Sequence, residues 1–266
     1  MKTSTTLANK PDSKFKKILT AILVAAIWLS VWQLLYMLIG KRLLFASPLQ
    51  AFGRLAALAL TGDFWRSIGL SLLRITAGFL AGSLTAIPIA ILTARSRFAH
   101  ALFSPALAVI KATPVASFIV LALVWIKSAD LSIFISFLMV LPMVWASLHQ
   151  GIISTDRELL EMAQVFGFGA MKRLKLIYFP SVKPYLISAL TAAIGFAWKA
   201  GVAAEVLAYP RDSIGFAIYS AKAQLETADL FAWTFVVVLL SIVIEKLFVS
   251  LIRRAQTRGR RSNDKV

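Results

Sequence analysis

Long apolar runs are the feature of this 266-residue sequence that most restricts its fold. A helix needs about 20 apolar residues to cross the hydrocarbon core of a bilayer. Runs near that length cover residues 18–40, 68–93, 104–126, 130–150, 185–208 and 230–252. Only 15% of the residues are charged, too few to cover the surface of a water-soluble domain of this size. We therefore predict an all-α, polytopic membrane protein with six transmembrane helices.

The positions of the basic residues predict the topology of these helices. If the N-terminus is cytoplasmic, the cytoplasmic segments are 1–17, 94–103, 151–184 and 253–266, and they hold 18 of the 29 Lys and Arg residues. This bias follows the positive-inside rule, so the net charge of +17 is largely topological and nucleic-acid binding is not expected. We expect a multi-pass protein of a bacterial plasma membrane with both termini in the cytoplasm. The basic tail 253–266 can also contact anionic membrane lipid.

Two hydrophilic segments carry helix signals of their own. In the first external loop, apolar residues at Leu49, Phe52 and Leu55 predict a short helix at the membrane interface. In the cytoplasmic loop 151–184, a T-x-x-E pattern at Thr155 predicts a capping box that starts a helix over 156–167.

The second half of the cytoplasmic loop predicts another short helix. Gly167 suits the left-handed position that ends the first helix, and a second helix is expected over 170–178, stopped by Pro180. Both helices are amphipathic and too small to fold alone. We therefore expect their apolar faces to rest on the membrane helices or on a partner protein.

One spaced pattern in this loop resembles a known motif, E-A-A-x3-G-x9-I-x-L-P. The matching residues are Glu161, Ala163, Gly167, Ile177 and Pro180, while Met162 replaces an alanine and Phe179 a leucine. The pattern is similar to the cytoplasmic motif of permease subunits of binding-protein-dependent, type I ATP-binding cassette (ABC) importers. The resemblance extends over about residues 18–252. The stretches SLLRITAGFLAGS and AWKAGVAAEVLA look most like the nitrate, sulfonate and taurine branch.

This resemblance implies a fold, partners and a role for the loop. It implies the type I importer permease fold, working as a homodimer. The 151–184 loop would be the coupling loop, seated on separate ABC ATPase subunits that bind ATP and Mg. An extracytoplasmic solute-binding protein would deliver the solute. The five matching residues would carry the coupling, and no cofactor is expected in this chain.

Nothing in the sequence predicts an enzyme active site. The chain has no G-x-x-x-x-G-K-[ST] segment for binding ATP phosphates and no cysteine, so ATP hydrolysis falls to a partner. His100 and His149 are far apart in the sequence, and we interpret them as interfacial polar residues rather than metal ligands.

Charged residues inside the apolar runs mark a candidate translocation pathway, because charge in lipid is costly. The charged candidates are Lys111, Lys199 and Glu205, and Trp198, next to Lys199, is a fourth candidate. Lys199 and Glu205 lie six positions apart, so a regular helix places them on different faces and each needs a partner elsewhere. Lys111 either lines the pathway or reaches the cytoplasmic interface, and Arg74 is expected to reach the external one. A lysine in the pathway would suit a small anion such as a sulfonate, taurine or nitrate.

Two other classes of function remain open from the residues alone. A secondary transporter driven by an ion gradient would carry inverted repeats with interrupted helices, and the sequence shows no such repeat. A membrane-embedded scaffold is the third class.

Overall fold

The fold is helical, as the apolar runs predict. The computed structural model describes residues 14–41 and 43–263, and these contain no strand. The helices are α1 (Lys14–Ile39), α2 (Pro48–Ala59), α3 (Gly62–Arg95), α4 (Arg97–Ala112), α5 (Val115–Ala122), α6 (Ser128–Ile153), α7 (Arg157–Val165), α8 (Ala170–Arg173), the π-helical turn η1 (Leu174–Tyr178), α9 (Phe179–Ala208), α10 (Ile214–Ala223) and α11 (Thr227–Asn263). The expectations for residues 1–13 and 264–266 lie outside the described residues.

Five of the described helical segments are long and apolar enough to cross a membrane, or six if α4 and α5 together form one span. These two helices meet at 102°, so the apolar run 104–126 is not one continuous helix. The break falls at Thr113, whose backbone is extended, and at Pro114, which precedes α5. A residue before proline is pushed out of the helical region by the proline ring, and this accounts for the position of the break.

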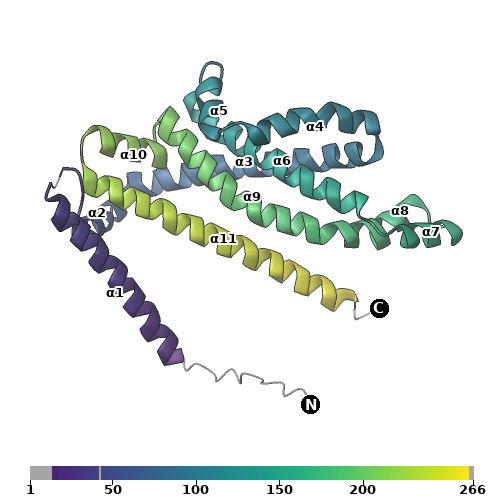
Figure 1. Cartoon of the computed structure of the whole chain (residues 1–266), viewed down its shortest axis with the longest axis horizontal. Coiled ribbons are helices and arrows are strands. Elements are labelled where there is room, and N and C mark those ends of the chain that lie inside the picture. The colour runs from purple at the N-terminus through teal and green to yellow at the C-terminus, as the bar shows by residue number, and fades with distance from the viewer. Residues whose placement is uncertain (1–13, 42, 264–266) are drawn as a thin grey trace, which may run out of the picture.

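The core of the bundle is formed by α3, α6 and α9, which run alongside one another (Figure 1). Small residues bring their backbones close together. A Cβ atom added to Gly78 of α3 would overlap the backbone carbonyl of Ile133 in α6, and one added to Gly201 of α9 would overlap the Ile75 side chain. Helices in membranes associate largely through such close packing, so these glycines determine how near the three helices lie.

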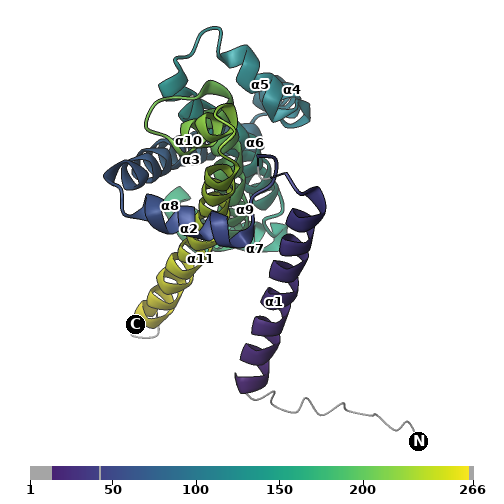
Figure 2. The same ribbon diagram turned by 90° about the vertical axis from the view of Figure 1, so that its left-hand side faces the viewer.

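Helix α1 stands at the edge of the molecule and projects away from the bundle (Figure 2). Its apolar side chains are exposed over most of its length, as in Trp28 and Leu38, which is the expected state of a lipid-facing helix. Toward its C-terminal end it contacts α11 and the segment that leads into α2. There the Trp32 indole donates to the Ala46 carbonyl (3.0 Å) and stacks on Phe231, with ring centroids 5.5 Å apart.

The two ends of the bundle carry different short helices (Figure 1). The α10 end also holds α2, and the α7 end holds α8. Helix α2 confirms the short helix predicted in the first loop: Ser47 and Gln50 form a reciprocal capping box at its start. A bidentate pair between Arg54 and Asp229 joins α2 to the first turn of α11, and the Asp229 carboxylate raises the pKa of the Arg54 guanidinium.

Candidate functional site

Helix α7 begins one residue later than the sequence pattern indicates. The predicted capping box at Thr155 is wrong. Its hydroxyl donates instead to the Gly151 carbonyl (3.3 Å), at the end of α6. The N-cap is Asp156, whose carboxylate accepts from the Glu158 amide (2.9 Å). Both residue types cap helices well, but Thr155 is buried and its amide and hydroxyl are bonded back to the last turn of α6.

The C-terminus of α7 is closed by a Schellman motif, as Gly167 predicts. The Phe168 amide donates to the Ala163 carbonyl (2.8 Å), and the Gly167 amide donates to the Gln164 carbonyl (3.1 Å). Gly167 has φ +64°, a conformation that glycine adopts without the steric cost of a Cβ atom. This turn reverses the chain direction and starts α8 close to the end of α7.

The surface of α7 is largely free of contacts with the rest of the molecule. Ala163 is fully buried, but α7 makes no extensive contact with any other described helix. The side chains of Leu159, Met162 and Phe166 are exposed by 41, 44 and 71%. They recur at i, i+3 and i+7 and therefore lie along one side of the helix. We call these three residues the α7 stripe. Glu161, next to Met162, is also exposed.

The second helix of the loop does not stop at Pro180, contrary to the sequence expectation. Helices α8, η1 and α9 form one continuous helical stretch from Ala170 to Ala208. Proline cannot donate to the carbonyl four residues back, and its ring clashes with that carbonyl. The π-helical turn relieves this conflict, since the Phe179 amide donates to the Leu174 carbonyl, five residues back. Pro180 directly follows this turn, and the helix continues through it into α9.

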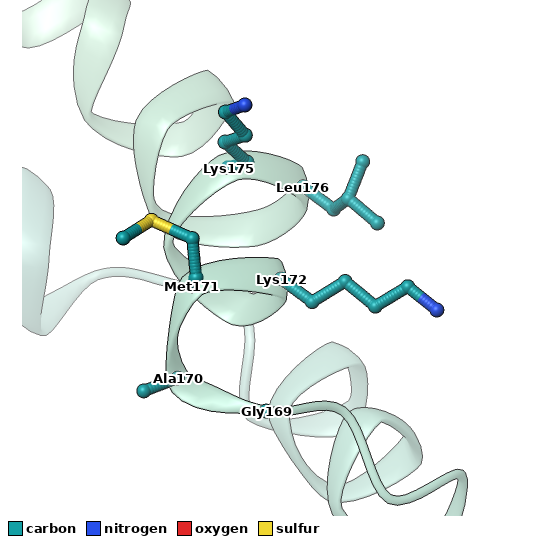
Figure 3. A pocket seen from close by; sticks show the side chains of 6 residues that line it. All are labelled: Gly169, Ala170, Met171, Lys172, Lys175 and Leu176. Atoms are coloured by element: carbon teal, nitrogen blue, oxygen red, sulfur yellow. The ribbon is translucent and has the colours of Figure 1, made fainter.

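A shallow, open hollow lies on the surface of α8 and η1 (Figure 3). Its lining residues are Gly169, Ala170, Met171, Lys172, Lys175 and Leu176. The Lys172 ammonium lies 4.8 Å from the centre of the Phe168 ring. The α7 end thus presents apolar and basic side chains together.

The five motif residues all lie at the α7 end, in α7, η1, the turn between α7 and α8, and the start of α9. Ala163 and Ile177 are buried, with 0% and 5% exposure. Glu161, Gly167 and Pro180 are exposed.

The four pathway candidates fall into two pairs. Lys111, in the last turn of α4, and Lys199, nine residues before the end of α9, are exposed on the surface of the subunit. Trp198 and Glu205 are buried inside it, and the Trp198 indole donates to the Val237 carbonyl of α11 (3.1 Å). One side of α9 is open along its length, at Ser188, Ala192, Phe196, Lys199, Ala203 and Leu207. We call these six residues the open face of α9.

Glu205 lies in a polar cluster that the sequence did not predict. The Ser71 hydroxyl donates to Glu205 Oε2 (2.6 Å) and accepts from the Ile214 amide (3.0 Å). Arg74, expected to reach the external interface, instead buries its Nη1 atom within electrostatic range of the Glu205 carboxylate. The hydroxyl of Ser71 is too common a feature of membrane helices to have indicated this cluster.

The two histidines are neighbours in space, although they are far apart in the sequence. The turn after α3 lays α4 back against α6, which brings the ring centroids of His100 and His149 to 4.9 Å. Thr93 Oγ1 lies 3.1 Å from His149 Nδ1 and accepts from the Trp145 indole (3.0 Å). Within the described part of the chain, no group of three or more His, Asp or Glu residues is arranged to hold a metal ion.

The fold matches that of a chain in a solved ABC transporter structure. The structure, a crystal structure of an amino acid ABC transporter with histidines, superposes with a TM-score of 0.62 at 17% sequence identity. The match covers 77% of this chain and 97% of the other. The two chains therefore share a fold over most of their length.

The chain belongs to the family of binding-protein-dependent transport system inner membrane components, whose sequence profile matches residues 86–261. It is 27% identical over 208 residues to a probable ABC transporter permease of Brucella melitensis, covering 78% of this chain and 84% of the relative. It is 24% identical over 259 residues to a putative aliphatic sulfonates transport permease of Bacillus subtilis (96% and 92%). The Escherichia coli taurine transport permease is 24% identical over 246 residues (90% and 89%). The protein is thus a multi-pass membrane permease.

Proposed function

We propose that this permease forms the translocation pathway of an ATP-driven importer for a small anion and that α7 couples it to a separate ATPase subunit. The observation that carries the proposal is the α7 stripe. Three apolar side chains are exposed on a helix that has no extensive contact with the other described helices. Contiguous exposed apolar surface marks a site of protein contact, and Glu161 beside it would supply a polar anchor.

The partners follow from the family and from what the sequence contains. Membership of a binding-protein-dependent family supports a solute-binding protein on the external side. The chain has no phosphate-binding G-x-x-x-x-G-K-[ST] segment, which favours ATP and Mg binding on a distinct ATPase. The positive-inside bias supports a cytoplasmic position for the α7 end and for both termini. The α10 end would then face the binding protein.

The open face of α9 supports the anionic substrate class. Lys199 lies on that face, nine residues from the end of an apolar helix, and a charge there is costly in lipid. The cost falls if the face lines a water-filled path between two copies of the permease. Lys111 would contribute a second cation to this path. The relatives named for sulfonates, taurine and bicarbonate favour the same class of solute. Trp198 and Glu205 would support the path from behind.

The coupling role is tested by one exposed substitution on each side of α7. Met162→Asp places a charge in the α7 stripe. Gln164→Asp places the same charge two residues on, about 200° around the helix, where the side chain is also exposed. Each variant is co-expressed with the ATPase and purified through a tag on the permease. We expect Met162→Asp to lose the ATPase and Gln164→Asp to retain it.

Retention of the ATPase by both variants would contradict the coupling role of α7. Loss in both variants would mean that any added charge disrupts α7, and would therefore also contradict a contact specific to the stripe. The rival function, secondary transport driven by an ion gradient, requires no ATPase, so both variants would then take up solute at the rate of the unaltered chain.

A further inference from the structure

Glu205 is the most deeply buried charged side chain of the described residues, and the pathway does not use it directly. Its exposure is 0%. It lies three residues before the end of α9, at the α10 end of the bundle. A buried carboxylate is costly unless it is paired and hydrogen-bonded. Its position therefore requires an explanation in terms of its neighbours.

Three other helices converge on this carboxylate. Ser71 of α3 donates to Oε2, and the Gly215 amide in the first turn of α10 lies 3.4 Å from the same atom. Arg74, one turn beyond Ser71 on α3, supplies a positive charge nearby, and Ser132 at the start of α6 lies beside the carboxylate. The carboxylate therefore bridges α9 to α3, α6 and α10.

The hydrogen bonds are directed at the N-terminus of α10. Ser71 Oγ accepts from the Ile214 amide while donating to Glu205, so it links the carboxylate to the first residue of the helix. The partial positive charge of a helix N-terminus favours a carboxylate there. Gly215 packs so closely on the Glu205 backbone that an added Cβ would overlap it. The contact leaves no room for α10 to shift toward α9.

Some polar atoms of the cluster have no hydrogen-bond partner among the described residues, so the attraction between the Glu205 and Arg74 charges is important. Glu205 Oε1, Arg74 Nη1 and Ser132 Oγ are buried and have no hydrogen-bond partner among the described residues. Glu205 Oε1 is thus an unpartnered atom of a fully buried side chain. Removing the Arg74 charge would leave the fully buried Glu205 carboxylate without a counter-charge.

The geometry of α9 connects this cluster to the open face. Lys199 and Glu205 are six residues apart, which at 3.6 residues per turn places their side chains about 120° apart around the helix. Holding Glu205 inward, against Ser71 and α10, therefore holds Lys199 outward. A rotation of α9 that released Glu205 would turn Lys199 away from the exposed side of the helix bundle.

We propose that Glu205 is a positioning residue. Its contacts with Ser71 and with the N-terminus of α10 fix the rotation of α9 about its axis, and this rotation keeps Lys199 exposed. The proposal rests on the proposed function only in its statement that the open face lines the pathway. The anchoring of α10 by Glu205 stands on the contacts of this chain alone.

Thiol labelling tests the rotation, because the chain contains no cysteine of its own. Ala203→Cys introduces a thiol on the open face, and Ala204→Cys introduces one at a buried neighbour with 0% exposure. Each is labelled with a small water-soluble maleimide in membranes. We expect fast labelling at 203 and slow labelling at 204. Adding Ser71→Ala should reduce this ratio of rates by roughly tenfold, the effect of losing one buried hydrogen bond to a charged group.

Two further variants separate positioning from general stability. Glu205→Gln keeps an oxygen that can accept from Ser71 and should preserve most of the labelling ratio, whereas Glu205→Ala should abolish it. Ser83→Ala is the matched control: it removes a buried hydroxyl from the same helix as Ser71, but that hydroxyl has no hydrogen-bond partner in the described residues. An unchanged ratio in both Ser71→Ala and Glu205→Ala would overturn the proposal.

Amide hydrogen exchange measures how firmly Glu205 and Ser71 hold the start of α10, and it requires no partner protein. The Ile214 and Gly215 amides should exchange about tenfold faster in Ser71→Ala and Glu205→Ala, while exchange in α6 stays unchanged.

If labelling at position 203 is slow in the otherwise unaltered chain, the open face does not meet water. That result contradicts the pathway, and exchange then decides the role of Glu205. Unchanged exchange in both variants would overturn that role.

Discussion

At the scale of single residues, Gly167 and Gly169 show that one residue type can meet different requirements at neighbouring positions. Gly167 has φ +64° and closes the Schellman motif of α7, whereas Gly169 has φ −63° and precedes α8 in an extended conformation. Neither would bring an added Cβ within 4 Å of another group. The requirement at Gly167 is therefore one of backbone conformation and not of space.

This difference predicts opposite outcomes for the same substitution. Gly167→Ala should cost about 1 kcal/mol at the C-terminus of α7, because a Cβ atom disfavours the left-handed region. Gly169→Ala should be neutral or slightly stabilising. Limited proteolysis of the loop in the purified protein measures the local opening of each variant. Equal cleavage rates in the two variants would contradict the assignment.

The lysine of the open face makes a second prediction at this scale. Lys199→Met should lower the uptake rate of the anionic solute by at least about tenfold, since it removes a positive charge from the proposed pathway. Lys246→Met, which removes an exposed lysine from α11, is the control and should leave uptake near that of the unaltered chain. Unchanged uptake in Lys199→Met, with normal expression, would remove this residue from the pathway.

The structural roles of some residues were predictable from the sequence and those of others were not. Gly167 was predictable because few residues other than glycine tolerate its conformation. The choice between Thr155 and Asp156 as N-cap was not, because both residue types cap helices and the outcome depends on where α6 ends. The partners of Glu205 depend on which faces of α3 and α9 meet, and the local pattern of one helix carries no such information.

At the scale of helices, two glycines of α3 determine how closely it packs against α6. Gly78 and Gly82 lie one turn apart on the same side of α3, and an added Cβ at either would come too close to a backbone carbonyl of α6. Gly69, on the same helix, meets no atom within 4 Å. The spacing of Gly78 and Gly82 matches the small-xxx-small pattern of packed membrane helices.

The packing predicts a difference between two substitutions on α3. Gly78→Ala should destabilise the protein by about 1–3 kcal/mol, the usual cost of overpacking a close contact. Gly69→Ala should stabilise it by up to about 1 kcal/mol, since alanine favours the helix and no contact opposes it. Thermal unfolding of both purified variants in one detergent measures the difference. Equal stability would mean that α3 and α6 adjust their separation at little cost.

The positions of the helices were predictable from apolar runs, but their interruptions were less so. A run of the right length predicts a span, yet residues 104–126 are divided at Pro114 into two helices. Pro180 has the opposite outcome, because a π-helical turn lets the helix continue through it. The sequence places the prolines, and the surrounding packing decides whether each one ends a helix.

At the scale of the whole molecule, the two ends of the bundle are specialised for different contacts. The α7 end exposes the α7 stripe, while the α10 end is fixed by the Glu205 cluster and by the pair of Arg54 and Asp229. The open face of α9 extends between them. An ATPase bound at the α7 end could thereby move helices whose opposite ends are joined to α10.

The family and the all-helical fold were predictable because the loop motif has five fixed positions and the apolar runs have a defined length. The proximity of His100 and His149 was not, because it depends on the turn that folds α4 back onto α6. Two residues 49 positions apart give no local sign that their rings will meet.

The central claim, that ATP hydrolysis by a separate subunit drives import through this permease, is tested most directly by uptake into proteoliposomes. Vesicles containing the permease and the ATPase are loaded with ATP and Mg and given the binding protein with labelled solute outside, with no ion gradient. The account predicts accumulation that requires ATP, the ATPase and the binding protein. Accumulation by the permease alone, driven by an imposed ion gradient and indifferent to ATP, would contradict it.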